Sequence, residues 1–255
     1  MLMFSKSSVA LERSPTVRSA KSGAVMTSGG APDEMRRWLV LRSEVDRHIE
    51  NHHSGMYGRL LKRPIDMIIS SLALIVLSPL FVVAALLVKC TSRGPAFYWQ
   101  TRVGRGGRFF RIVKFRSMIA DADKKGPDIT SSGDPRVTSV GSVFRKLKID
   151  ELPQLWNVLA GDMSLVGPRP ELPRYVLDYS QEELGVLCVR PGITDTASIR
   201  YRHEEEILAR SGDPEEYYRN VVLRHKLALN LEYMRNMSFW YDARMVLQTI
   251  RCLFV

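Results

Sequence analysis

The sequence has few cysteines, and no two of them are spaced to act together. Cys90, Cys188 and Cys252 are the three in 255 residues, and no C-x-x-C pair occurs. This scarcity argues against a disulfide framework or a zinc ribbon and fits a reducing compartment. Hydrophobic residues make up 45% and charged residues 25%, which excludes collagen-like and wholly disordered chains. The length suits one large domain or two small ones.

Negative charge is scarce in the middle of the chain. Residues 59–149 hold 17 basic and 5 acidic side chains, against 8 and 6 in residues 1–58 and 12 and 16 in residues 150–255. The middle of the chain is therefore expected to face an anionic partner. Phosphorylated small molecules, an anionic membrane leaflet and nucleic acid all fit this charge.

A long apolar run occupies residues 65–88, where Asp66 is the one charged residue. As a straight helix it would be about 36 Å long, enough to cross a hydrocarbon core of ~30 Å. Basic residues flank both ends, so the positive-inside rule places both ends in the cytoplasm. Ser78 and Pro79 lie in the middle, where proline is expected to kink a helix. From these residues alone, a re-entrant helix and a kinked spanning helix are about equally supported.

The segments on either side of the apolar run are predicted to form an N-terminal extension and a β-hairpin. Residues 1–31 predict a flexible tail and residues 32–50 a short amphipathic helix, so that residues 1–57 precede a domain of residues 58–255. Residues 96–102 and 108–115 predict two strands around a glycine-rich turn. Their basic residues recur every two to three positions, so several can share one face. Residues 119–139 predict a polar loop.

Residues 142–159 contain two adjacent carboxylates, Asp150 and Glu151. The pattern of this segment predicts one short helix that ends near Ile149 and another that begins around Asp150. Asp150 and Glu151 then lie at a helix N-terminus, which favours an ionised carboxylate, as a nucleophile or a metal ligand requires. Ordinary helix capping is the competing interpretation.

Two rigid loops each deliver an arginine next to proline. Residues 161–170 place Arg169 between Pro168 and Pro170, which suits a phosphate clamp, and Arg190 begins a second such motif. From Glu215 onward the pattern predicts two helices, the second starting near Ser238 with three aromatic residues. The segment that forms these helices suits either core packing or a position in the membrane interface.

Taken together, these motifs resemble those of the bacterial sugar transferases, the monotopic polyprenyl-phosphate phosphoglycosyl transferases, over about Gly58 to Val255. The resemblance rests on Lys62-Arg63-Pro64-Ile65-Asp66, Ser78-Pro79, Lys114-Phe115-Arg116, Arg145 before Asp150-Glu151-Leu152, Gly161 to Pro170, and Arg190 to Thr194. It implies a mainly helical monotopic membrane enzyme with a small β-hairpin, a re-entrant helix-break-helix at Ser78-Pro79, and interfacial amphipathic helices.

The resemblance also implies a reaction. Sugar 1-phosphate would pass from a nucleoside diphosphate sugar, expected to be a UDP-sugar, to undecaprenyl phosphate on the cytoplasmic face of the bacterial inner membrane. Asp150 would be the nucleophile and a Mg²⁺ ligand, with Glu151 as a general base or second carboxylate. Lys114, Arg145, Arg169 and Arg190 would bind phosphate or nucleotide. The product would prime exopolysaccharide or a related glycan.

Two points remain open at this level. Many relatives continue Gly-Trp-Ala-Gln after the position of Thr194, whereas this chain continues Asp195-Thr196-Ala197-Ser198, so donor identity cannot be transferred from them. A non-enzymatic scaffold of a polysaccharide assembly complex is the competing function. The bilayer is an expected partner and a second copy of the chain is a further candidate, whereas nucleic acid is not expected, because no nucleic-acid-binding motif is recognisable.

Overall fold

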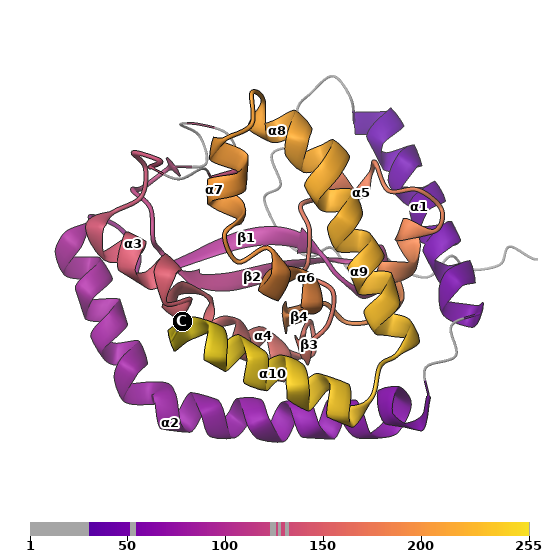
Figure 1. The fold of residues 1–255 in the computed structure, drawn as a ribbon, viewed down its shortest axis with the longest axis horizontal. Coiled ribbons are helices and arrows are strands. Elements are labelled where there is room, and N and C mark those ends of the chain that lie inside the picture. Colours follow the sequence, from indigo (N-terminus) through magenta and orange to yellow (C-terminus); the bar gives the residue numbers. More distant parts are fainter. Residues whose placement is uncertain (1–30, 52–54, 123–125, 127–128, 131–132, 255) are drawn as a thin grey trace, which may run out of the picture.

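The computed structural model describes residues 31–51, 55–122, 126, 129–130 and 133–254. The predicted tail therefore falls almost wholly outside the described residues. The rest is mainly helical with a small antiparallel hairpin, as predicted (Figure 1). The chain order is α1 (Ala31–Asn51), α2 (Lys62–Thr91), β1 (Phe97–Val103), β2 (Phe109–Phe115), α3 (Ser139–Lys146), α4 (Gln154–Ala160), β3 (Ser164–Val166), α5 (Pro173–Val176), β4 (Gly192–Thr194), α6 (Thr196–Arg200), α7 (Glu204–Ala209), α8 (Pro214–Tyr217), α9 (Leu223–Arg235) and α10 (Phe239–Phe254).

Helix α2 contains the apolar run and is long and apolar enough to cross a membrane. Most of its large apolar side chains face outward, and Val76 is 74% exposed. The predicted break at Ser78-Pro79 is a bend within one continuous helix, and Figure 1 shows α2 bending about midway. Pro79 has no N–H to donate to the carbonyl of Ile75, and the Ser78 hydroxyl donates to that oxygen instead at 2.8 Å. The bend thus leaves no unpaired carbonyl there.

The predicted hairpin is confirmed, with β1 and β2 antiparallel and Phe97 opposite Phe115. Alternation along the strands gives the two faces different roles. Phe115 packs with Phe81 and Ala84 of α2 and with Phe144 of α3 on one face. Gln100, Arg102 and Lys114 share the other face, which covers the polar site described below.

The main core joins the N-terminal helix to the C-terminal half of the chain. Trp38, Leu41 and Val45 recur on one face of α1 and are buried with Leu223 and Tyr233 of α9. The predicted helix over residues 32–50 is therefore confirmed, and it belongs to the same hydrophobic core as α9.

Three charged side chains attach the start of α2 to the rest of the domain. Lys62 forms an ion pair with Asp242 of α10. Arg63 donates to the carbonyls of Val158 and Leu159, the latter at 3.0 Å, near the end of α4. Asp66 accepts a 2.7 Å hydrogen bond from the hydroxyl of Ser164 in β3. The lone charge of the apolar run is thus a buried anchor.

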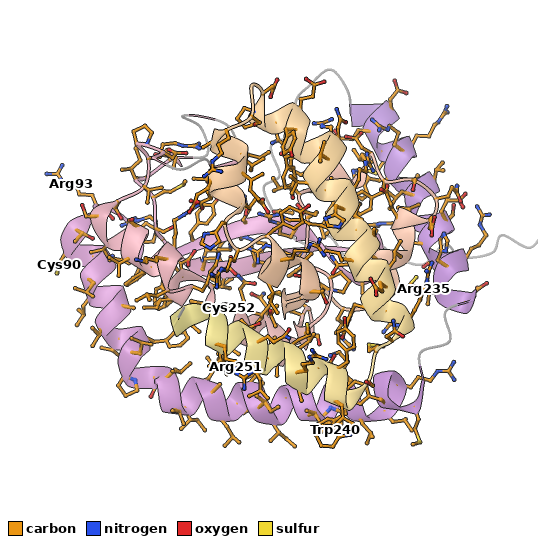
Figure 2. All side chains as sticks on the ribbon, in the orientation of Figure 1. Cys90, Arg93, Arg235, Trp240, Arg251 and Cys252 are labelled. Carbon is orange, nitrogen blue, oxygen red and sulfur yellow. The ribbon has the colours of Figure 1, made fainter. Side chains whose placement is uncertain are left out.

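Helix α10 begins at Phe239, close to the predicted start, and its first turn lies against the start of α2, where Asp242 pairs with Lys62. Its outer side carries exposed apolar residues, and Trp240 is 79% exposed next to α2 (Figure 2). Helix α9, by contrast, buries Leu223, Leu227 and Tyr233 in the main core. The core interpretation therefore holds for α9, and α10 presents an apolar face to the surroundings.

Candidate active site

The two predicted carboxylates lie on a single 3₁₀ turn, Ile149–Glu151, between α3 and α4. The expected boundaries were inaccurate by a few residues, because α3 ends at Lys146 and α4 begins at Gln154. Lys148 adopts a left-handed backbone conformation with φ of 55°, which redirects the chain out of α3 into the turn. Both Asp150 and Glu151 are buried.

Glu151 is fully occupied by cations. Its Oε1 atom accepts a 2.9 Å bond from Lys114 of β2, and Arg169 binds both carboxylate oxygens, with a 3.1 Å bond to Oε2. Burial opposes ionisation, but Arg169 and Lys114 outweigh it and hold the pKa of Glu151 well below its usual range. Glu151 is therefore a fixed anion that orients two cations at the site.

Asp150 has the opposite character. Its side chain is 6% exposed, and its buried Oδ1 atom has no hydrogen-bond partner among the described residues. Burial raises the pKa of Asp150 to about 6, and the Glu151 carboxylate adds to the rise. Lys114, Lys148 and Arg145 act against that rise through their charge. The site thus holds a carboxylate that is desolvated, close to cations and free to bond an incoming group.

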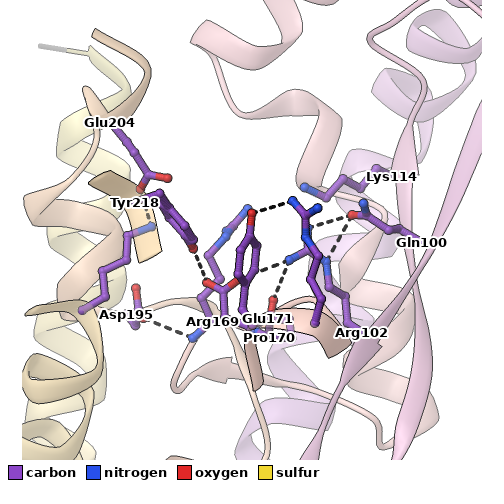
Figure 3. A network of polar contacts seen from close by, with 12 residues as sticks. Gln100, Arg102, Lys114, Arg169, Pro170, Glu171, Asp195, Glu204 and Tyr218 are labelled. Atoms are coloured by element: carbon purple, nitrogen blue, oxygen red, sulfur yellow. Dashed lines mark hydrogen bonds and ion pairs between the residues drawn. The ribbon is translucent and has the colours of Figure 1, made fainter. Parts of the chain in front are cut away.

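Arg169 stands on a loop that is held at several points. Gly167 N donates to the carbonyl of Thr194 at 3.0 Å, because β3 and β4 pair in parallel. Arg102 donates to the carbonyl of Pro170 at 3.1 Å, and Tyr218 donates to the Glu171 carboxylate at 2.7 Å (Figure 3). The arginine predicted to act as a clamp is therefore fixed by its surroundings.

The other two predicted cations differ in position. Arg145 lies close enough to Asp150 to lower its pKa, and its guanidinium pairs with Glu205 of α7. Arg190 donates to the carbonyl of Gly161 at 2.9 Å, beyond the end of α4, and its charged neighbours include Arg63 and Asp66. The structure thus brings Lys114, Arg145 and Arg169 toward the Asp150-Glu151 pair and does not bring Arg190 there.

Two buried polar residues near the site, Asn157 and Gln154, are not predicted from the sequence. Asn157 of α4 bridges to β2, accepting from Val113 N at 3.0 Å and donating to the carbonyl of Arg111 at 2.8 Å. Gln154 is buried one helical turn after Asp150, and its amide nitrogen has no partner among the described residues. In the sequence, the feature that could identify Gln154 as a neighbour of the site is its spacing of four residues from Asp150. No local pattern marks Asn157, because its partners lie in a distant strand.

The donor set fits a magnesium ion only if the substrate completes it. The described residues contain no group of three or more His, Cys, Asp or Glu side chains that could hold a metal. Mg²⁺ in phosphoryl-transfer sites is commonly held by one or two carboxylates together with substrate phosphates and water. The Oδ1 atom of Asp150, which no described residue engages, meets that requirement, whereas both oxygens of Glu151 are already engaged.

A family model described as "Bacterial sugar transferase" matches residues 57–255. The chain therefore belongs to the bacterial sugar transferase family, and the resemblance inferred from its motifs is confirmed.

Among its relatives is the UDP-N-acetylgalactosamine-undecaprenyl-phosphate N-acetylgalactosaminephosphotransferase of Aeromonas hydrophila, 39% identical over 80% of this chain and 48% of that protein. The UDP-glucose:undecaprenyl-phosphate glucose-1-phosphate transferase of Caulobacter vibrioides is 40% identical over 75% of this chain and 68% of that protein. An exopolysaccharide production protein of Sinorhizobium fredii is 36% identical over 76% of this chain and 85% of its own length. The chain spans about half the length of the first of these relatives.

Proposed function

We propose that this protein transfers a sugar 1-phosphate from a UDP-sugar to undecaprenyl phosphate and so primes exopolysaccharide or a related glycan. The observation that carries the proposal is the buried carboxylate of Asp150, which lies beside several cations and has one oxygen without a hydrogen-bond partner in the described ranges of the chain. The printed activities of the Aeromonas and Caulobacter relatives support the same reaction class.

In the first step, a carboxylate oxygen of Asp150 attacks the sugar-linked phosphorus of the donor. The new bond joins this oxygen to phosphorus, and the bond from that phosphorus to the bridging oxygen breaks. UMP leaves with the electron pair, and a phosphoglycosyl-aspartate remains. Lys114 and Arg169, fixed by Glu151, are placed to offset the negative charge that gathers when two anions approach.

In the second step, a phosphate oxygen of undecaprenyl phosphate attacks the same phosphorus and the aspartyl bond breaks. The carboxylate of Asp150 is regenerated, and the product is a polyprenyl diphosphate sugar. Splitting the transfer this way predicts ping-pong kinetics. When bound through Asp150 and the donor phosphates, Mg²⁺ would supply further charge neutralisation.

We further propose that α2 enters the cytoplasmic leaflet of the bacterial inner membrane and returns to the same side. The bend at Pro79, the outward apolar side chains of α2 and the exposed apolar side of α10 support this placement. Basic residues beyond both ends of the apolar run, such as Arg59 and Arg93, favour the cytoplasm for both ends. The active site would then lie beside the leaflet that holds its lipid substrate.

The enzymatic proposal is tested with full-length protein purified in detergent. The protein is incubated with Mg²⁺, undecaprenyl phosphate and a panel of UDP-sugars, and the released nucleotide is identified. We expect UMP release and, without undecaprenyl phosphate, one UMP per protein together with a mass increase of one phosphosugar on the peptide that contains Asp150. Asp213→Asn, at an exposed turn before α8, is the matched control and retains full activity. Release of UDP, or a fully active Asp150→Asn protein, would refute the proposal.

The membrane proposal has a separate test. Cys90 is exposed at the end of α2 and can be labelled with a membrane-impermeant maleimide (Figure 2). Both measurements use a Cys252→Ser background, because Cys252 is partly exposed, and a Met56→Cys substitution with Cys90→Ser places a second label before α2. We expect both sites to react in inverted vesicles and neither in spheroplasts. Labelling of the two sites from opposite sides would establish a spanning helix instead.

A further inference from the structure

Asp195 is the first residue of the segment that departs from the commoner family pattern, and its side chain is 0% exposed. It directly follows β4. One carboxylate oxygen accepts from the main-chain N–H of Ser198 and caps α6, and the other accepts from the main-chain N–H of Arg169 at 3.1 Å. A single buried carboxylate therefore joins the start of α6 to the loop that carries the arginine of the site.

Main-chain donors are scarce at this point of the loop. Pro168 and Pro170 have no N–H, so Arg169 provides the only main-chain donor of these three residues. That donor is bonded to Asp195. On either side of it, the loop is held through the N–H of Gly167 and through the carbonyls of Pro168 and Pro170, which accept from Gly192 and Arg102. The Asp195 contact thus acts at the residue whose guanidinium binds Glu151.

We propose that Asp195 is a positioning residue, which holds the main chain of Arg169 so that its guanidinium engages Glu151 on both oxygens. This inference rests on the proposed function, because it gives Asp195 an effect on phosphosugar transfer through Arg169. Charge supports it as well. Glu151 raises the pKa of Arg169 most strongly, and the carboxylate of Asp195 adds to that rise, so the half-buried cation is stabilised by two carboxylates.

The decisive variant is Asp195→Ser. Serine is a good helix N-cap, so the bond to Ser198 N can be kept, but its single, shorter oxygen cannot also reach Arg169 N. In Asp195→Asn the side chain keeps one acceptor oxygen, but its NH₂ group faces the second main-chain N–H and cannot accept a hydrogen bond from it. The matched control is Asp213→Ser, because Asp213 also caps a short helix, α8, through two main-chain N–H groups and lies at an exposed turn.

The first readout needs no substrate. Hydrogen exchange is followed by mass spectrometry on a peptide that covers residues 165–171. Asp195→Ser is expected to speed exchange there by about tenfold, since a protecting hydrogen bond is lost. Asp213→Ser is expected to leave this peptide unchanged. Equal exchange in wild type and Asp195→Ser would overturn the inference.

The second readout is a double-mutant cycle on UMP release from the best UDP-sugar of the panel. Asp195→Ser is expected to lower kcat by about 10- to 100-fold, as for a misplaced catalytic group. Added to Arg169→Ala, it should cost less than about threefold more, because the residue it positions is already absent. If the losses of kcat in the two single variants multiplied in full in the double variant, Asp195 would act independently of Arg169, and the inference would be overturned. If the wild type released no UMP, the proposed function would fail, and the exchange result would still decide the role of Asp195.

Discussion

Two buried carboxylates of this protein, Asp150 and Asp242, have contrasting surroundings. Asp242 joins α10 to the start of α2 and uses both of its oxygens. One accepts from Tyr57 at 2.7 Å and pairs with Lys62, and the other accepts from Tyr233 at 2.8 Å. Asp150 is equally buried, yet one of its oxygens has no partner in the described part of the chain.

The contrast separates a carboxylate that stabilises the fold from one that is available for chemistry. Buried polar atoms in folded proteins are nearly always hydrogen-bonded, because an unpaired one costs free energy. At Asp242 that cost is offset within the protein. At Asp150 it is left for a ligand to offset, while nearby cations keep the group within reach of ionisation. Four predictions test this difference.

The largest expected effect is on activity at Asp150. Asp150→Asn removes the attacking oxygen while keeping size and shape, so UMP release should fall by at least about 1,000-fold. The free energy of unfolding should not fall, because the substitution removes a buried charge that lacks a full set of partners. Steady-state kinetics and thermal unfolding of the same preparation measure both. A marked loss of stability would show that Asp150 is a structural carboxylate like Asp242.

The converse effect is expected at Asp242. Asp242→Asn leaves the ammonium of Lys62 buried without its counter-ion, which should destabilise the protein by about 3–5 kcal/mol. At the size of this domain the Tm should fall by about 10 °C. Adding Lys62→Met should recover part of the loss, because the unpaired charge is then removed. The prediction is checked by thermal unfolding of wild type and the two variants in the same detergent. Equal Tm values for Asp242→Asn and wild type would contradict it.

A smaller effect is expected at Arg169. Arg169→Lys keeps the charge but cannot bind both oxygens of Glu151, so kcat should fall by about 10- to 100-fold. The Tm should change little, because Glu151 retains Lys114. Arg190→Lys is the matched comparison, since Arg190 bonds a carbonyl away from the carboxylate pair. A larger activity loss at Arg190 than at Arg169 would reverse the assignment of the two arginines.

The smallest effect is a shift along the pH axis. Burial raises the pKa of Asp150 to about 6, so kcat/KM should rise with pH and reach half of its plateau near pH 6. The sign for stability is opposite. A carboxyl whose pKa is raised in the folded state holds its proton more tightly there, so its contribution to stability is lost as pH rises from about 4 through 6. The difference in the free energy of unfolding between wild type and Asp150→Asn, measured in EDTA over this pH range, isolates that contribution. A difference that does not vary over this range would indicate an ordinary carboxyl.

Much of this architecture could be predicted from local sequence. The apolar run of α2, the alternating strands of the hairpin and the start of α10 depend on periodicity and turn residues, which neighbouring positions fix. Asp150 and Glu151 could be identified because they fall at a helix boundary inside a run of family motifs. The helix boundaries themselves were less well predicted, since the 3₁₀ turn requires the left-handed backbone of Lys148.

What each polar residue does was decided by the tertiary structure. Arg169 and Arg190 look alike in sequence, each next to a proline, yet in the fold Arg169 binds Glu151 and Arg190 binds the carbonyl of Gly161. Asp66 reads as a charge inside an apolar run, and its partner Ser164 lies 98 residues away. The sequence by itself determined the long apolar helix, the hairpin, the helices α1 and α10 and the carboxylate pair, because these depend on near neighbours. Which carboxylate is satisfied and which is left open was settled by contacts between distant segments, and no local pattern encodes those.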